Sequence, residues 1–263
     1  MKRTLYWILP VVVLAIGVVA QAQQTAAPAA PAKLDIKAEQ VMEKAIDAIG
    51  GRKAFEGLKS QYMKGKFEFP SMGVTGESEI FQKAPNKQMS VTTVEGFGEV
   101  RSGFDGQVAW ADNPMAGLTT MEGEALAAIR LQSTFNGELK WKELYPKAEL
   151  KGKEPVGDRE AYVIELTPAE GKPATHYYDA ETFLLLRSDV VIPTMSGMNL
   201  VQWMFSDYKD VEGRKIPHTI KQNIPEGEIV ITLAEVKSNI EIDDAKFAKP
   251  GPPPAPEAKP EQK

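Results

Sequence analysis

The fold class is decided by residues 62–83, YMKGKFEFPSMGVTGESEIFQK, where apolar residues recur at every second position on both sides of a turn. Successive side chains of a strand point to opposite faces, so Met63, Phe67 and Phe69 share one face and the charged residues between them share the other. The middle of the stretch, PSMG, has the composition of a turn. The whole stretch therefore predicts an antiparallel β-hairpin.

The same period of two continues along most of the chain outward from this hairpin. Short segments rich in glycine, proline and acidic residues separate the runs and predict turns. We expect further strands at 88–94, 99–110, 148–154, 160–167, 174–179, 184–192, 198–208, 215–224 and 228–236. So many hairpin-linked strands predict a mainly β (α+β) fold built on one large antiparallel sheet that curls on itself.

A few segments have helical rather than strand periodicity. We expect helical segments at 35–49, 52–58 and 122–135. Asp35 is suited to cap the first of these, and Gly50-Gly51 can end it in the left-handed conformation. These helices are expected to cover the curled sheet.

One predicted strand is apolar on both faces. Leu200 and Met204 share one face of it, while Val201, Trp203 and Phe205 share the other. Burial of both faces of the strand inside the protein would explain this pattern, and so would an interface with a partner.

The first 22 residues have the three parts of a cleavable secretory signal peptide: Lys2 and Arg3, an apolar run, and Ala20-Gln21-Ala22. The apolar run is shorter than the roughly 20 residues that a spanning helix needs. We therefore expect a soluble, periplasmic mature chain with no integral membrane span.

Two further segments, 23–34 and 249–263, consist mainly of alanine, proline and polar residues. Neither has enough apolar residues to offset the entropy of ordering, so we predict a disordered linker and a disordered Pro-rich tail. Residues 35–248 remain as a single domain.

The composition argues against several kinds of chemistry. The chain has no cysteine and two histidines, His176 and His218, and it contains neither H-E-x-x-H nor a Walker lysine motif. We predict no catalytic residues, no metal site and no cofactor. The net charge of −5 comes without a cluster of Lys and Arg, so we expect no nucleic-acid partner.

Aromatic residues are distributed over many of the predicted strands. Core packing accounts for most of them, and a cavity fit for an acyl chain is the functional interpretation. The candidates for such a cavity are Phe67, Phe69, Phe104, Trp110, Trp203 and Phe205.

Five motifs, in order, are AIGG at 48–51, GFDGQVAW at 103–110, EAYVIEL at 160–166, YYDAETFL at 177–184 and FSDYKDVEGRKIP at 205–217. In this order the chain resembles the LolA/LolB-like group, the outer-membrane lipoprotein-sorting proteins of the periplasm. The resemblance implies an unclosed β-barrel covered by helices, an apolar cavity for lipid chains and no covalent catalysis. It also implies an arginine that contacts the helical lid, for which Arg101 is the candidate by position.

These observations favour a non-enzymatic periplasmic carrier or binder of lipid or lipoprotein acyl chains. A periplasmic sensor or interaction module that binds an envelope protein is the first alternative, motivated by the two-faced strand and the Pro-rich tail. An envelope hydrolase is the second.

Overall fold

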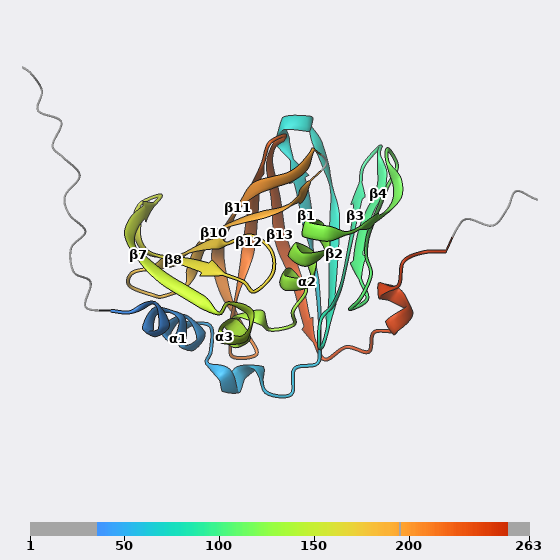
Figure 1. Ribbon diagram of the computed structural model, residues 1–263. Helices are drawn as coiled ribbons and strands as arrows, with labels where there is room; N and C mark the ends of the chain where they lie inside the picture. The colour runs from blue at the N-terminus through green and yellow to red at the C-terminus, as the bar shows by residue number, and fades with distance from the viewer. Residues whose placement is uncertain (1–35, 195, 252–263) are drawn as a thin grey trace, which may run out of the picture. The chain divides into compact units, whose positions relative to one another are not determined.

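The computed structural model describes residues 36–194 and 196–251 (Figure 1). The predicted signal peptide, the linker at 23–34, the capping residue Asp35 and most of the Pro-rich tail lie outside these described residues.

Thirteen strands and seven helical segments make up the described part of the chain. The strands are β1 (Ser60–Phe69), β2 (Val74–Lys83), β3 (Lys87–Val94), β4 (Gly98–Phe104), β5 (Ala109–Asn113), β6 (Gly117–Met121), β7 (Lys147–Val156), β8 (Arg159–Thr167), β9 (Ala174–Asp179), β10 (Leu185–Thr194), β11 (Gly197–Val211), β12 (Arg214–Ile224) and β13 (Gly227–Ser238). The α-helices are α1 (Ala38–Ala48), α2 (Gly123–Gln132) and α3 (Trp141–Leu144), and the 3₁₀ segments are η1 (Arg52–Phe55), η2 (Pro70–Met72), η3 (Gly137–Lys140) and η4 (Asp244–Phe247).

All thirteen strands form one antiparallel sheet in the order β6-β5-β4-β3-β2-β1-β13-β12-β11-β10-β9-β8-β7. Strands adjacent in the chain are adjacent in the sheet, except β6 and β7, which form its two ends. In addition, β1 pairs with β13. Within the described residues the end strands β6 and β7 do not pair with each other, so the sheet is an unclosed barrel. The predicted fold class is confirmed.

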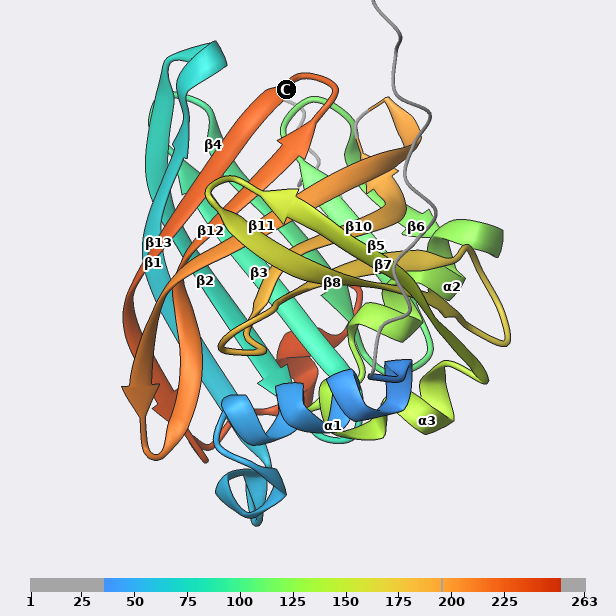
Figure 2. The same ribbon diagram turned by 90° about the vertical axis from the view of Figure 1, so that its left-hand side faces the viewer.

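The sheet is curved, and helix α2 lies between its left-hand and right-hand strands in Figure 1 and at the right-hand edge of the molecule in Figure 2. This helix contacts β5 and β10, two strands from opposite halves of the sheet order. A flat sheet would hold these strands far apart, so their shared contact with one helix is a direct sign of the curl.

The hairpin predicted from residues 62–83 is confirmed. β1 and β2 pair from Ser60↔Lys83 to Phe69↔Val74, and Gly73 adopts the left-handed conformation, with φ of 65°. This turn needs a residue that tolerates positive φ, which glycine does at no steric cost.

The run predicted as one strand at 99–110 is two strands, β4 and β5, so that prediction was wrong in its extent. Asp105 makes the break, because its Oδ1 accepts hydrogen bonds from the backbone N–H groups of Gln107 (2.8 Å) and Val108 (2.7 Å). Such an Asx turn competes with the sheet ladder for backbone donors. Gly106 completes the turn with φ of 102°.

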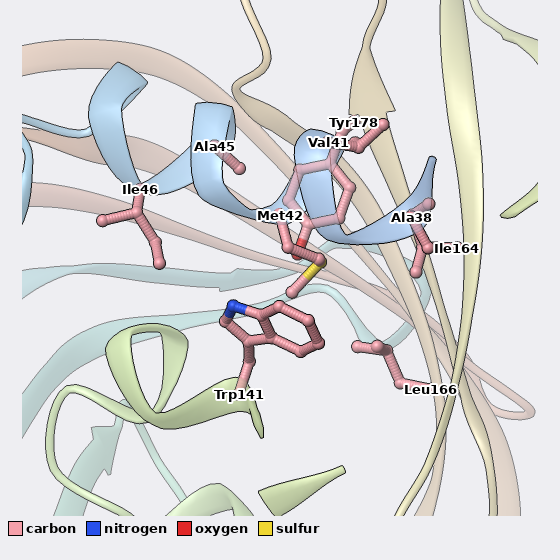
Figure 3. Close-up of a cluster of buried hydrophobic side chains, with 9 residues drawn as sticks. All are labelled: Ala38, Val41, Met42, Ala45, Ile46, Trp141, Ile164, Leu166 and Tyr178. Carbon is pink, nitrogen blue, oxygen red and sulfur yellow. The ribbon is translucent and has the colours of Figure 1, made fainter. Parts of the chain in front are cut away.

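The main core lies between α1, α3 and the strands β8 and β9 (Figure 3). In this cluster Trp141 of α3 faces Met42 of α1, and Leu166 and Tyr178 contribute from the sheet. α1 begins after Lys37, whose backbone N–H donates to Gln40 Oε1 at 2.8 Å. The buried residues of α1 are Ala38, Val41, Met42, Ala45 and Ile46, so the apolar stripe recurs at three and four residues as predicted.

A second cluster lies under the segment that follows β13. Phe247 of η4 is fully buried against Trp110, and the Trp110 indole N–H donates to the Phe247 carbonyl at 2.9 Å. Lys83 holds the same segment through the Ile242 carbonyl and the Asp244 carboxylate, both at 2.7 Å. The folded chain therefore continues past the last strand to η4.

The two-faced strand, β11, is covered unequally. Val201 is fully buried on one face, and Met204 on the other face packs against a small cluster that contains Val163 and Tyr177. Leu200 stays 57% exposed. Burial therefore explains most of the two-faced pattern.

Among the described residues, none of the helices has the length and apolar character to cross a membrane.

Candidate functional site

A cavity of about 490 Å³ lies between α1, the η3–α3 segment and the sheet. Its apolar lining includes Met42, Ala45 and Ile46 of α1, Trp141 and Leu144 of α3, and Met63, Leu166, Leu185, Phe205 and Ile216 of the sheet. The cavity has the size and the mostly apolar wall that are typical of small-molecule sites.

The C-terminal end of α1 is fixed against the hairpin between β11 and β12. The Lys215 N–H donates to the Ile49 carbonyl at 2.9 Å. Gly50 has φ of 120°, and a Cβ on this residue would lie 2.2 Å from the Gly213 carbonyl oxygen. Only glycine permits this approach, which sets one wall of the cavity.

α1 is also held to the η3–α3 segment by polar contacts. The Trp141 indole N–H donates to Glu43 at 3.3 Å, and Lys142 pairs with Glu39 and Glu43. Arg52, just after α1, donates to the Leu139 carbonyl at 2.8 Å. These contacts make α1, η1, η3 and α3 one covering layer over the cavity.

One part of the cavity wall is polar. Glu138 of η3 lines the cavity, and this residue is exposed. Enclosure by protein raises the pKa of Glu138 above its ordinary value, although its own backbone N–H and the nearby Arg214 act in the opposite direction.

Three tyrosines and a histidine form a further polar part of the cavity wall. His176 Nδ1 and the Tyr178 hydroxyl are 3.1 Å apart, and the Tyr145 and His176 rings meet edge to face at 6.4 Å between centroids. Tyr208 donates its hydroxyl to the Leu185 carbonyl at 2.7 Å. All four side chains line the cavity.

Burial determines the protonation states of the histidine and tyrosine side chains in the cavity wall. It lowers the pKa of His176 to about 4, despite an opposing effect of Asp189, so the imidazole is neutral at pH 7. It raises the pKa of Tyr145 to about 12 and also raises the pKa of Tyr178, where Tyr145, Tyr208 and Glu138 add to the effect. The phenols therefore remain hydrogen-bond donors.

Arg214 is the buried cation of the cavity wall, with 2% of its surface exposed. Its guanidinium donates to Ser238 Oγ at 2.6 Å and to Gln61 Oε1 at 3.4 Å, and it pairs with Glu212 at 3.4 Å. It also lies 5.8 Å from the centre of the Phe55 ring. These partners hold the guanidinium in place.

Comparison with solved structures identifies the architecture. A LolA superfamily protein from Nitrosomonas europaea superimposes with a TM-score of 0.53 at 16% identity, over 81% of this chain and 98% of that one. A domain named as an outer membrane lipoprotein-sorting protein, from Vibrio parahaemolyticus, gives 0.53 at 13% identity, over 81% and 97%. The fold is LolA-like.

A DUF1329 family protein from Desulfovibrio piger has the same LolA-like fold, with a TM-score of 0.52 at 15% identity, over 80% of this chain and 97% of that one. No protein-family model matches the sequence, and neither does any curated protein.

Within the LolA-like fold, the aromatic candidates take different places. Phe205 of β11 lines the cavity, and Trp203 lies on the same face of that strand with its indole N–H buried and without a partner among the described residues. Phe67 and Phe69 share the face of β1 that bears Met63 and lie nearer the hairpin turn, with Phe69 buried against Gly227.

The other candidates lie away from this cavity. Phe104 is 1% exposed on β4, and Trp110 packs under η4. Arg101 of β4 pairs with Asp112 of β5 at 2.5 Å. Arg214, not Arg101, is the arginine in the cavity wall. A role of these residues in ligand binding stays a prediction.

The residues considered for catalysis are not brought together into one catalytic group. His218 makes a local contact through Nδ1 to the Ile216 carbonyl at 2.9 Å. Asp179 holds a turn, with Arg159 Nε 2.5 Å from its carboxylate. Among the described residues, no group of three or more His, Cys, Asp or Glu side chains is arranged to hold a metal ion.

Sequence reasoning missed Glu138, Tyr145, Tyr208 and Arg214 as cavity residues. Two of them lie in the short η3–α3 segment and its exit, which has no strong period. Arg214 follows Gly213 in an ordinary strand-turn pattern, which gives no sign that the side chain is buried.

Proposed function

We propose that this protein is a non-enzymatic carrier or binder of lipid or lipoprotein acyl chains, working as a soluble protein of the periplasm. The observation that carries the proposal is the cavity of about 490 Å³ with its apolar lining under α1 and α3. Each buried CH₂ of an acyl chain contributes about 0.8 kcal/mol to binding, so one chain that fills the cavity supplies substantial affinity.

The LolA-like fold supports this proposal, and so does the signal-peptide pattern of the first 22 residues. A solved neighbour with this fold is named for outer membrane lipoprotein sorting. The positions of His176, His218 and Asp179 agree with binding rather than catalysis, because each of these side chains has a local structural partner.

The test is binding of a fluorescent fatty-acid probe together with native mass spectrometry of protein purified from its own cell envelope. We expect probe binding and a co-purified acyl ligand. Protein that binds no probe and carries no acyl ligand would contradict the proposal.

A pair of variants locates the binding. Met63→Trp places a larger side chain in the cavity wall on β1, and we expect it to weaken probe binding by about tenfold or more. Met72→Trp is the matched control, because Met72 is 59% exposed at the turn of the same hairpin. Equal probe affinity in both variants would place the bound chain elsewhere.

A second candidate function, an interaction module for an envelope protein, is favoured by Leu200, which is 57% exposed on β11. Crosslinking in cells through a photoreactive residue at position 200 tests it. Capture of one envelope protein supports this candidate, and no capture sets it aside.

A further inference from the structure

The cavity wall holds a buried positive charge. Arg214 lines the cavity and is 2% exposed. A guanidinium does not lose its proton in a protein, so its burial requires anionic partners or hydrogen-bond acceptors. Lys215 and Glu138 also line the cavity, but both are exposed and their charges are opposite. Among the described residues of the lining, Arg214 is therefore the charge that burial removes from water.

The partners of Arg214 leave part of this charge uncompensated. The guanidinium donates to Ser238 Oγ at 2.6 Å, to Gln61 Oε1 at 3.4 Å and to Glu212 Oε2 at 3.4 Å. Ser238 and Gln61 are neutral, and the Glu212 side chain is 64% exposed, so water weakens its attraction for the guanidinium. A guanidinium carries more N–H donors than these contacts use. Donors of Arg214 therefore remain for a ligand.

Gln61 adds a further donor beside Arg214. Because its Oε1 accepts from Arg214, its Nε2 amide group points away from the guanidinium and keeps its own N–H donors. Gln61 also lines the cavity. Met63 lies two positions along β1, on the same face, and lines the cavity as well. This wall of the cavity therefore changes from donor-rich to apolar along one strand, as a fatty acyl chain with a polar end requires.

These donors fit a ligand that carries a single negative charge. A carboxylate accepts two parallel hydrogen bonds from the fork of a guanidinium, and such charge-assisted bonds are among the strongest in proteins. A phosphate monoester carries about two negative charges at neutral pH, more than one cation balances, and the carboxylates of Glu138 and Glu212 would repel it. The chemistry of the wall therefore favours a carboxylate.

We infer that Arg214 and Gln61 form a carboxylate site, and that the ligand of the cavity is a free fatty acid whose chain lies along the apolar wall past Met63. A neutral glyceride with the same chain would leave the charge of Arg214 without a counterion. This inference rests on the proposed function, because it assigns the polar end of the same ligand.

The experiment compares decanoate with 1-monodecanoylglycerol, which has the same acyl chain and no charge, by displacement of an uncharged fluorescent probe at pH 8 and below the aggregation limit of either amphiphile. We expect the wild-type protein to bind decanoate about tenfold or more tightly than the glyceride, a difference of about 1.4 kcal/mol. Arg214→Met removes the charge and should abolish this preference. Arg130→Met is the matched control and should keep it, because Arg130 is exposed on α2 and is not part of the cavity lining.

A measurement on the wild-type protein keeps the test independent of the folding of the variant. NMR of decanoate labelled at its carboxyl carbon follows the pKa of the bound ligand. A guanidinium beside the carboxylate lowers this pKa below that of free decanoate, whereas an apolar wall alone raises it and exposure to water leaves it unchanged. We expect the lowered value.

Three outcomes overturn the carboxylate site while the acyl-binding function stands. They are equal affinity of the wild-type protein for the two amphiphiles, an unchanged preference in folded Arg214→Met, and a bound carboxyl group whose pKa is not lowered. Binding of neither amphiphile by the wild-type protein overturns both the site and the function.

Discussion

At the scale of single residues, Asp179 shows how one buried carboxylate holds a turn. It is 1% exposed and accepts hydrogen bonds from the Thr182 N–H at 2.6 Å, the Thr182 hydroxyl at 2.9 Å and the Glu181 N–H at 3.0 Å. Burial by itself would raise the pKa of Asp179, but these donors and Arg159 outweigh it and hold the pKa below its ordinary value.

We expect Asp179→Ala to lower the free energy of unfolding by about 3 kcal/mol at pH 7, because several buried donors and the Arg159 charge lose their acceptor. Urea unfolding measures this loss. Glu181→Ala is the control, since Glu181 has an 89% exposed side chain and its removal should cost less than about 0.5 kcal/mol.

The same variant should show a defined pH dependence. The folded-state pKa of Asp179 is lowered, so its contribution is complete above the ordinary carboxyl pKa of about 4 and is lost as the pH falls through the folded-state value. The difference in unfolding free energy between the wild-type protein and Asp179→Ala should therefore shrink in acid. A constant difference from pH 7 to pH 2 would contradict this account.

At the scale of elements, the contact between the end of α1 and the β11–β12 hairpin depends on one glycine. An added Cβ at Gly50 would lie 2.2 Å from the Gly213 carbonyl oxygen, whereas at Gly57, which also has a positive φ of 72°, a Cβ would meet nothing within 4 Å. Both positions require a positive φ, but only at Gly50 does another part of the backbone lie too close to admit a Cβ.

Gly57→Ala should cost about 1 kcal/mol, the penalty of a left-handed backbone for alanine. Gly50→Ala should cost about 2 kcal/mol more, because the Ile49–Lys215 contact must open to admit the methyl group. Thermal unfolding measures both. Equal losses in the two variants would mean that α1 can shift without penalty.

The elements also show which parts of the structure the sequence alone could predict. Alternation in residues 62–83 predicted the hairpin and its faces, because a strand with one buried side must alternate. The break inside 99–110 was missed, since Asp105-Gly106 sits between two apolar runs of the same period. Helix α3 has only 4 residues, too few to show a helical repeat.

The cavity was predictable in kind but not in its residues. Phe205 was a candidate and lines it, whereas Trp110, equally apolar, lies under η4. Both residues lie in strands with the same alternation of apolar and polar residues. Contacts between residues distant in sequence determine which face of each strand a helix covers. The polar wall formed by Glu138 and Arg214 combines residues far apart in the chain, so no local pattern reveals it.

At the scale of the whole molecule, β13 is the strand that joins the two halves of the sheet, because it lies between β1 and β12. We expect a chain truncated after residue 226, which lacks β13 and η4, to lose cooperative urea unfolding, since β1 and β12 then each lose one of their two partner strands and no strand links the halves. A chain truncated after residue 251 should unfold like the full-length protein. A cooperative transition in the shorter chain would show that the halves fold separately.

The pairing of β1 with β13 also has a consequence in time. Gln61 finds its partner Ser238 only when almost the whole chain has been made, because a ribosome delivers β1 among the first strands and β13 as the last. Contacts between residues this far apart in sequence slow folding, since a long loop must close first. A nascent chain therefore carries β1 with one of its two edges unpaired through nearly all of its synthesis, and the sheet stays divided into two halves until β13 emerges.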